Sequence, residues 1–203
     1  MKNNNKIFLG EFIASCFLVM VIVGSGIMAE NLTNDNAVRL LANTIATGAG
    51  LFVLITAFAN ISGAHLNPFV SLSMYLTKRI KGKELLTFIP AQILGCLLGV
   101  MLANVFFEHS IIELSTKNRD GFHIFLSEIV ATFGLIFIIF ATLKDGKTTV
   151  AACVATYISA GYWFTSSTSF ANPAVAIART FTDSFTGINY LNTPTYILSL
   201  IHI

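Results

Sequence analysis

Five long runs of hydrophobic residues alternate with short polar stretches along the 203-residue chain. The runs lie at residues 7–28, 40–60, 85–107, 122–143 and 148–165. Each run approaches the ~20 residues that an α-helix needs to cross the hydrocarbon core of a bilayer. The first run is longer than the apolar part of a signal peptide and four more runs follow it, so we treat it as a retained helix. The pattern predicts an all-α membrane protein with five full spans.

Two shorter apolar stretches begin with an Asn-Pro pair, in SGAHLNPFV (residues 62–70) and in TSFANPAVA (residues 168–176). Asn is a favoured N-cap and Pro is favoured in the first helical turn, so each pair predicts the start of a helix. The space that follows suits short half-helices at residues 68–76 and 173–181. In a bilayer, an irregular loop that leads into a half-helix is tolerated only where protein buries it or where it lines a watery cavity.

The chain also contains an internal repeat. FLGEFIAS (residues 8–15) is similar to FLSEIVAT (residues 125–132), and each segment carries one Glu at the same place, Glu11 or Glu128. An odd number of spans separates the two copies, which predicts inverted repeats at residues 1–121 and 122–203. The first repeat has three spans and a half-helix, whereas the second has two spans and a half-helix. The N-termini of both half-helices would meet near the bilayer centre, where their dipoles favour neutral hydrogen-bonding solutes over cations.

Composition and charge agree with a membrane protein. The chain is 55% hydrophobic and 11% charged, with a mean hydropathy of +0.75, and such values are unusual for a soluble domain. Basic residues near span ends prefer the cytoplasmic side. With a cytoplasmic N-terminus, the inner side has eight basic residues: Lys2, Lys6, Lys78, Arg79, Lys81, Lys83, Lys144 and Lys147. The outer side has four: Arg39, Lys117, Arg119 and Arg179. The net charge of +2 gives no reason to expect a nucleic-acid partner.

The sequence offers little for catalysis or metal binding. Cys16, Cys96 and Cys153 lie singly in apolar runs, and we interpret all three as packing residues. We expect no disulfide, metal or cofactor. No nucleophile, base and orienting group share a spacing, so we also expect no enzymatic activity.

The paired Asn-Pro boxes, the SGAHLNP approach and the early Glu of each repeat resemble the major intrinsic proteins, the aquaporin family. The resemblance implies an aquaporin-like right-handed bundle that assembles as a homotetramer in the lipid bilayer of a bacterial inner membrane. It implies that Asn67 and Asn172, with Pro68 and Pro173, form the pore constriction. Carbonyls that accept hydrogen bonds from solute are implied at Gly63, Ala64, His65, Ser167, Thr168 and Ser169. Glu11 and Glu128 are implied to brace the loops by accepting N–H bonds; the alternative is that each Glu is simply solvated near an interface.

The chain departs from the family pattern at the expected selectivity filter. Counting from each Asn places filter positions at Thr47, Ala160, Ser169 and Val175, and Val175 stands where most members have Arg. This predicts a wide, mildly polar filter that passes solutes larger than water. Ala176 stands where glycerol facilitators usually have Asp, so the chain fits that branch poorly. Phe69 stands where the Asn-Pro box normally has Ala, which predicts a modest change in the bore of the pore. The NPAVxIAR segment resembles a bacterial branch found with arsenic-resistance genes, so arsenite and methylarsenicals are candidate solutes.

Arg179 and His65 each have two readings. Arg179 follows Val175 by four residues and shares its helical face, so its guanidinium could reach back and replace the missing filter charge. The reading that we favour from sequence is that it extends outward and pairs with Asp183. His65 could act as a pH gate, but in this pattern a structural role for its carbonyl is favoured.

The last departure concerns the C-terminal part of the sequence. The apolar stretch 196–203 is far shorter than the ~20 residues of a span, so a sixth span is predicted to be missing. Three functions remain open at this point: a passive channel for small neutral solutes, an ion-coupled secondary transporter, and a non-conducting remnant of a channel. A transporter normally needs ion-coordinating carboxylates in mid-membrane, and only Glu11 and Glu128 are available.

Overall fold

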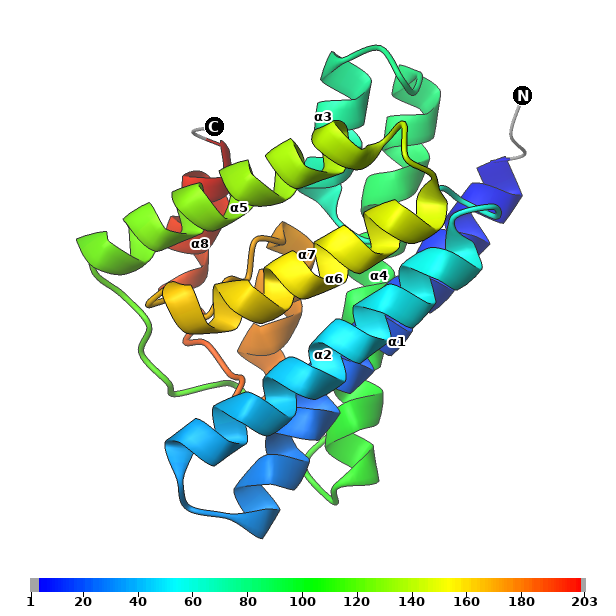
Figure 1. Cartoon of the computed structure of the whole chain (residues 1–203). Coiled ribbons are helices and arrows are strands. Elements are labelled where there is room, and N and C mark those ends of the chain that lie inside the picture. The colour runs from blue at the N-terminus through cyan, green and yellow to red at the C-terminus, as the bar shows by residue number, and fades with distance from the viewer. Residues whose placement is uncertain (1–3, 202–203) are drawn as a thin grey trace.

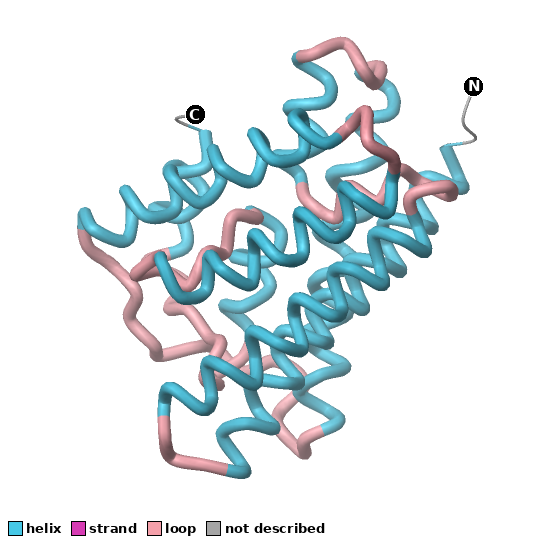
Figure 2. The backbone as a smooth tube through the Cα atoms, viewed as in Figure 1, coloured by secondary structure: helices cyan, strands magenta, loops and turns pink. Residues whose placement is uncertain are grey.

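The computed structural model describes residues 4–201, and every regular element in this range is helical (Figures 1 and 2). Lys2, one of the basic residues used to predict orientation, lies outside the described residues, as do the last two residues of the predicted second repeat. Within residues 4–201, four helices are long and apolar enough to cross a membrane. They are α1 (Asn4–Leu32), α2 (Asn36–Phe58), α4 (Gly82–Phe106) and α5 (Phe122–Thr142).

The fifth predicted span forms α6, Lys147–Phe164. This helix has 18 residues, but it is not among the four that qualify as spans by length and composition. Its sequence, KTTVAACVATYISAGYWF, begins with Lys and mixes Thr, Ser and Tyr with the apolar residues. In the bundle, α6 lies between α2 and α5 and contacts both (Figure 1).

Helices α1 and α4 cross at close range because α4 presents glycine at the contact. A Cβ atom at Gly95 would collide with the carbonyl oxygen of Phe12, and one at Gly99 would collide with that of Cys16. Small residues that let helix backbones approach are the usual packing device inside a bilayer. The largest buried hydrophobic cluster extends from α1, α2 and α4 across to α5, α6 and α7.

The two Asn-Pro pairs begin two short helices. Helix α3 covers Pro68–Leu76, and α7 covers Pro173–Ala178 and continues as the 3₁₀ turn η1, Arg179–Phe181. These bounds coincide with the half-helices expected from the sequence. Asn67 and Asn172 are the N-caps, both with extended backbone at φ −153°, and their side chains accept main-chain N–H bonds from the first turn. The chain therefore starts each helix by the same local chemistry.

The last described element, α8 (Thr193–Ile201), has nine residues, which is less than half the length of a membrane span. It packs against α5 and α7. The ring of its buried Tyr196 lies 4.6 Å from that of Phe170, centroid to centroid. Helix α8 therefore covers the loop that leads into α7.

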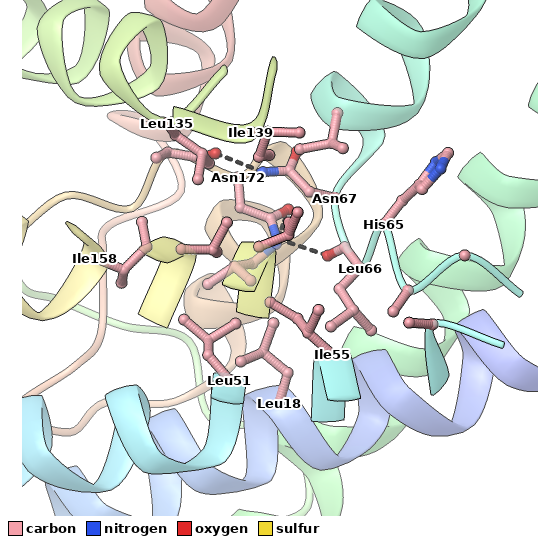
Figure 3. A pocket seen from close by; sticks show the side chains of 18 of the residues that line it. Leu18, Leu51, Ile55, His65, Leu66, Asn67, Leu135, Ile139, Ile158 and Asn172 are labelled. Atoms are coloured by element: carbon pink, nitrogen blue, oxygen red, sulfur yellow. Dashed lines mark hydrogen bonds between the residues drawn. The ribbon is translucent and has the colours of Figure 1, made fainter. Parts of the chain in front are cut away.

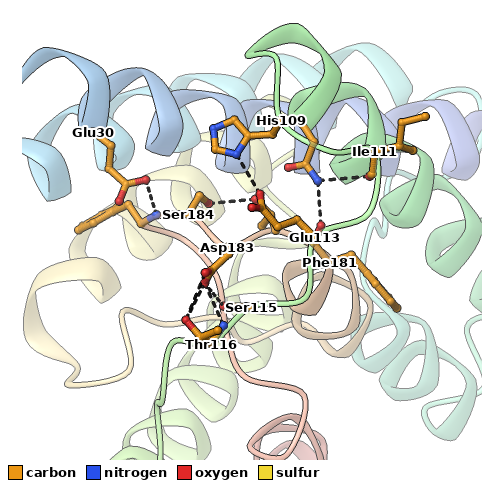
Figure 4. A network of polar contacts seen from close by, with 12 residues as sticks. Glu30, His109, Ile111, Glu113, Ser115, Thr116, Phe181, Asp183 and Ser184 are labelled. Carbon is orange, nitrogen blue, oxygen red and sulfur yellow. Dashed lines mark hydrogen bonds and ion pairs between the residues drawn. The ribbon is translucent and has the colours of Figure 1, made fainter.

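The loop between α4 and α5 clamps the segment that follows η1. The main-chain N–H of Ser115 donates to Thr180 O (3.0 Å), and that of Asn189 donates to Lys117 O (2.8 Å). Figure 4 shows Asp183 turned toward Ser115 and Thr116, where it accepts the Thr116 N–H at 2.9 Å. Burial lowers the pKa of Lys117, while the nearby Glu30 carboxylate acts in the opposite direction. The loop thus fixes the chain at the C-terminal end of the second half-helix.

Candidate pore

One cavity of about 400 Å³ lies between the long helices and the two half-helices. At one end it reaches Arg79 and Lys147, and at the other Arg179. Its walls are mostly aliphatic, and Figure 3 shows the side chains of Leu18, Leu51, Ile55, Leu135, Ile139 and Ile158 around it. Residues of the two loops that precede the half-helices also line it. The cavity therefore combines aliphatic walls with a smaller number of polar residues.

The two loops have the same backbone pattern. Counted back from each cap, positions four, three and one have positive φ: Gly63 (117°), Ala64 (52°) and Leu66 (54°) in the first loop, and Thr168 (65°), Ser169 (50°) and Ala171 (44°) in the second. Five of these six residues are not glycine and therefore adopt a backbone conformation that is sparsely populated. Such residues persist only where the surroundings hold them.

Two buried glutamates hold these loops. Glu11 of α1 accepts the N–H groups of His65 (3.1 Å) and Leu66 (2.7 Å). Glu128 of α5 accepts those of Phe170 (2.9 Å) and Ala171 (2.8 Å). Both side chains are 0% exposed, so the alternative that they are solvated near an interface is wrong. Each carboxylate binds the two residues immediately before one cap.

The two caps are bonded to one another's loops. Asn67 Nδ2 donates to Ala171 O at 2.6 Å, and Asn172 Nδ2 donates to Leu66 O at 2.8 Å. Figure 3 shows the two side chains facing each other inside the cavity, each with its bond to the opposite loop. A side-chain amide has two N–H donors, so each Asn keeps one that this bond does not use. Pro68 and Pro173 occupy the first helical turn behind them.

The predicted filter positions do not all reach the cavity. Thr47, Ser169 and Val175 line it, but Ala160 is exposed on the outer face of α6, so this assignment was wrong. Ile158 and Tyr162 of the same helix line the cavity instead. They are four residues apart and share one helical face, whereas Ala160, between them, points away. Counting without gaps from the Asn could not fix the rotation of α6.

An aromatic side chain, Tyr162, is therefore present beside the predicted filter positions. The Tyr162 hydroxyl donates to Thr47 Oγ1 at 3.1 Å, and Tyr162 is fully packed with 4% exposure. The hydroxyl side of Ser169 lies close to Gly161 of α6. The cavity lining therefore contains a larger and more polar side chain than the filter positions assigned from the sequence.

The set of loop residues along the cavity also differs from the expectation. Gly63, Ala64 and His65 line it as expected, together with Leu66. In the second loop Ser169, Phe170 and Ala171 line it, but Ser167 and Thr168 do not. The two loops are equivalent when each is counted back from its cap. In the second loop, the residues that line the cavity therefore lie one or two positions later in the sequence than the residues predicted to do so.

His65 and Phe69 are both half-buried. The His65 ring stacks on Phe88 at 4.2 Å, and its Nδ1 lies 3.0 Å from Ser71 Oγ. Phe69 donates its N–H to Asn67 Oδ1 and does not line the cavity. The ring of Phe69 therefore lies outside the cavity lining, and the modest change in bore expected from the sequence stays a prediction.

Arg179 differs most from the favoured sequence reading. Its side chain is 3% exposed and lines the cavity. Its Nε donates to Thr186 O, and the guanidinium carbon lies 3.5 Å from the centroid of the Phe170 ring. Among the described residues it forms no ion pair with Asp183, which is bound to the loop between α4 and α5 (Figure 4). The outward pairing predicted from the sequence is wrong.

Fold and site together define an all-helical membrane protein in which two capped half-helices meet across one cavity. The family model described as Major intrinsic protein matches residues 1–199, and the chain belongs to this family. The family comprises membrane channels rather than enzymes. The chain is a multi-pass integral membrane protein.

Several relatives are similar to this chain over 70% or more of its length. Aquaglyceroporin AqpS of Rhizobium meliloti (strain 1021) is 45% identical over 191 residues, which cover 94% of this chain and 82% of AqpS. Aquaporin TIP1-2 of Musa acuminata is 36% identical over 149 residues, or 70% of this chain. Aquaporin-4 of Rattus norvegicus is 28% identical over 187 residues, or 90% of this chain. The matched regions cover only 58% and 54% of those two proteins.

The fold is similar to that in the X-ray structure of the aquaglyceroporin from Plasmodium falciparum. The TM-score is 0.68, with 98% of this chain and 82% of that chain covered. The sequence identity is 21%, so this match bears on the fold alone.

Proposed function

We propose that the chain forms a passive channel for water and small uncharged solutes, which pass through the cavity between the half-helices. The single observation that carries this proposal is the pair of crossed Asn caps. Each cap offers an amide N–H in a cavity whose other walls are mostly apolar. A solute that loses water on entry finds donors there and carbonyl acceptors along the loops.

The charges around the cavity support neutral solutes over cations. The charged residues that line it are Arg79, Lys147 and Arg179, and no Asp or Glu of the described chain is among the lining residues. Positive side chains and helix N-termini both oppose cation entry. The same observation argues against an ion-coupled transporter, because Glu11 and Glu128 are bonded to the loops and do not face the cavity.

For the finer solute range, we infer that the channel also conducts polyol-like solutes, arsenite and methylarsenicals. Val175 supports this inference because it lines the cavity where an arginine is usual in the family. The 45% identity to a protein named aquaglyceroporin supports solutes larger than water. The link to arsenic rests on the resemblance of the NPAVxIAR segment.

We further infer two inverted repeats, residues 1–121 and 122–203, in a right-handed bundle with five spans and a cytoplasmic N-terminus. The matching φ pattern of the two loops and the matching Glu bonds support the repeat. A bacterial inner membrane is supported by the relative from Rhizobium meliloti. Assembly as a homotetramer rests on the family resemblance.

Stopped-flow light scattering on proteoliposomes tests the proposed function with water, glycerol and arsenous acid as solutes. We expect the unmodified chain to conduct all three. Val175→Arg should reduce glycerol and arsenous acid permeability about tenfold, or ~1.4 kcal/mol in the barrier to permeation, because it narrows the cavity. Val175→Ala is the matched control and should conduct at least as well. Protein that is correctly inserted but conducts none of the three solutes would contradict the proposal.

A further inference from the structure

Arg179 occupies an unusual position for a cation. It lies seven residues after the cap Asn172, in the 3₁₀ turn that extends α7, and it is buried, with 3% exposure. A buried guanidinium is costly unless its donors are satisfied. Here the guanidinium carbon lies 3.5 Å from the centroid of the Phe170 ring, and the Thr186 carbonyl accepts from Nε.

These contacts fix the direction of the side chain. Phe170 belongs to the loop that lines the cavity. Thr186 belongs to the segment that the loop between α4 and α5 clamps, through Ser115, Lys117 and their neighbours. The side chain is therefore held at two points by parts of the protein that are themselves fixed. Held in this way, Arg179 lies along the cavity wall rather than in lipid or bulk water.

The terminal nitrogens of Arg179 are available to the cavity. Within residues 4–201, the hydrogen bond of its side chain uses Nε, and Nη1 and Nη2 have no protein acceptor. A guanidinium has five N–H donors, four of them on these two nitrogens. Buried donors are almost always paired with protein or with water. Since Arg179 lines the cavity, the partners of Nη1 and Nη2 come from water or solute inside it.

The surroundings of Arg179 complete a selective site. Val175, one helical turn before it, gives an apolar wall, and the Tyr162 hydroxyl bound to Thr47 gives a neutral polar pair. No carboxylate of the described residues lines the cavity to compete for the guanidinium. A passing solute is the acceptor that this arrangement lacks.

We propose that Arg179 determines solute specificity by binding two oxygens of the solute with its terminal nitrogens. This inference rests on the proposed function, because it assumes that solutes cross the cavity. The planar guanidinium fork donates two parallel N–H bonds, which match two oxygens on one central atom. The channel should therefore favour small neutral oxyacids, with two or more oxygens on one centre, over solutes of equal size with a single oxygen.

Boric acid and urea provide a matched pair of probes for this proposal. Both are small, planar and neutral at pH 7, but boric acid has three oxygens on its central atom and urea has one. The measurement is the ratio of boric acid to urea permeability in proteoliposomes. Arg179→Met keeps the length of the side chain and removes its donors. We expect this variant to lower the ratio about tenfold, the size of one charge-assisted hydrogen bond.

Two further variants make the result decisive. Arg39→Met is the matched control, because Arg39 also donates from Nε to a carbonyl, Thr33 O at 2.7 Å, yet does not line the cavity; its ratio should equal that of the unmodified chain. Arg179→Lys keeps the charge and a donor for Thr186 but lacks the fork, so its ratio should fall as well. If Arg179→Met does not insert, Arg179→Lys alone decides.

The possible results separate the two proposals. An unmodified chain that conducts, with an unchanged ratio in the inserted Arg179 variants, overturns the role of Arg179 and leaves the channel function standing. An unmodified chain that conducts neither probe nor water overturns the channel function itself. A ratio that falls in the Arg179 variants and not in Arg39→Met supports the inference.

Discussion

At the scale of single residues, the two loops before the half-helices depend on one carboxylate each. The loops hold five non-glycine residues at positive φ, and each such residue costs on the order of 1 kcal/mol. Glu128 and Glu11 offset this cost, because each accepts two N–H groups that no helix or sheet would otherwise satisfy. The shape of the cavity therefore rests on side chains that do not face it.

The substitution Glu128→Gln tests this dependence. A Gln amide presents one oxygen and one NH₂ group, so the N–H of Phe170 or Ala171 would lose its acceptor. The loss of one buried acceptor costs ~1–3 kcal/mol, or a fall of about 5 °C in the melting temperature of a chain of this size. We expect this fall in detergent, together with reduced water permeability. Glu108→Gln, at an exposed site, is the control, and equal melting temperatures of the two variants would contradict the bracing role.

At the scale of the elements, the contact between α1 and α4 sets the frame for the first half-helix. Glycine at Gly95 and Gly99 allows the α1 backbone to approach α4. In the same region Gln92 of α4 donates to Glu11 at 2.8 Å and to Ser71 of α3 at 3.0 Å. A displacement of α4 would therefore be passed directly to the first loop and its cap.

Two Gly→Ala variants in the same helix separate packing from helix propensity. At Gly95 the added Cβ would collide with the Phe12 carbonyl, whereas at Gly82 its nearest neighbour would be Tyr75 at 3.6 Å, an ordinary contact. Overpacking of a tight contact costs ~1–3 kcal/mol. We expect Gly95→Ala to lower the melting temperature in detergent and Gly82→Ala to leave it unchanged or raise it. A stable Gly95→Ala variant would show that α1 and α4 can separate without penalty.

At the scale of the whole molecule, orientation in the membrane follows from the uneven charge of its loops. The basic cluster between α3 and α4 contains Lys78, Arg79, Lys81 and Lys83, whereas the loop between α4 and α5 mixes both signs. Basic residues near spans favour the cytoplasmic side. This charge bias predicts that Arg79 and Lys147, which line the cavity, lie toward the cytoplasm and that Arg179 lies toward the opposite side.

Labelling of single cysteines tests this orientation. Cys16 and Cys96 are buried and Cys153 is half-buried. The Cys153→Ser variant therefore keeps only two buried cysteines, which a thiol reagent should not label. In this background Lys81→Cys and Asn118→Cys each add one exposed thiol. In intact cells with a permeabilised outer membrane, a membrane-impermeant maleimide should label position 118 and not position 81. The opposite pattern would show that the N-terminus is outside.

The amino-acid sequence by itself determined the local features of this protein. Run lengths predicted four of the long apolar helices, because the bilayer sets their length. Asn67-Pro68 and Asn172-Pro173 predicted the starts of α3 and α7, because capping is a contact within one turn. The two glutamates stood out because a lone carboxylate in an apolar span needs a partner.

The tertiary structure alone decided everything that depends on how helices rotate and where distant segments meet. Tyr162 and Ile158, rather than Ala160, face the cavity because the packing of α6 against α2 and α5 fixes its rotation. Arg179 turns toward the cavity because it contacts the Phe170 ring and donates to the Thr186 carbonyl. Asp183 instead accepts a hydrogen bond from Thr116 in the loop between α4 and α5. None of these partners is a sequence neighbour of the residue it holds, so spacing along the chain could not reveal them.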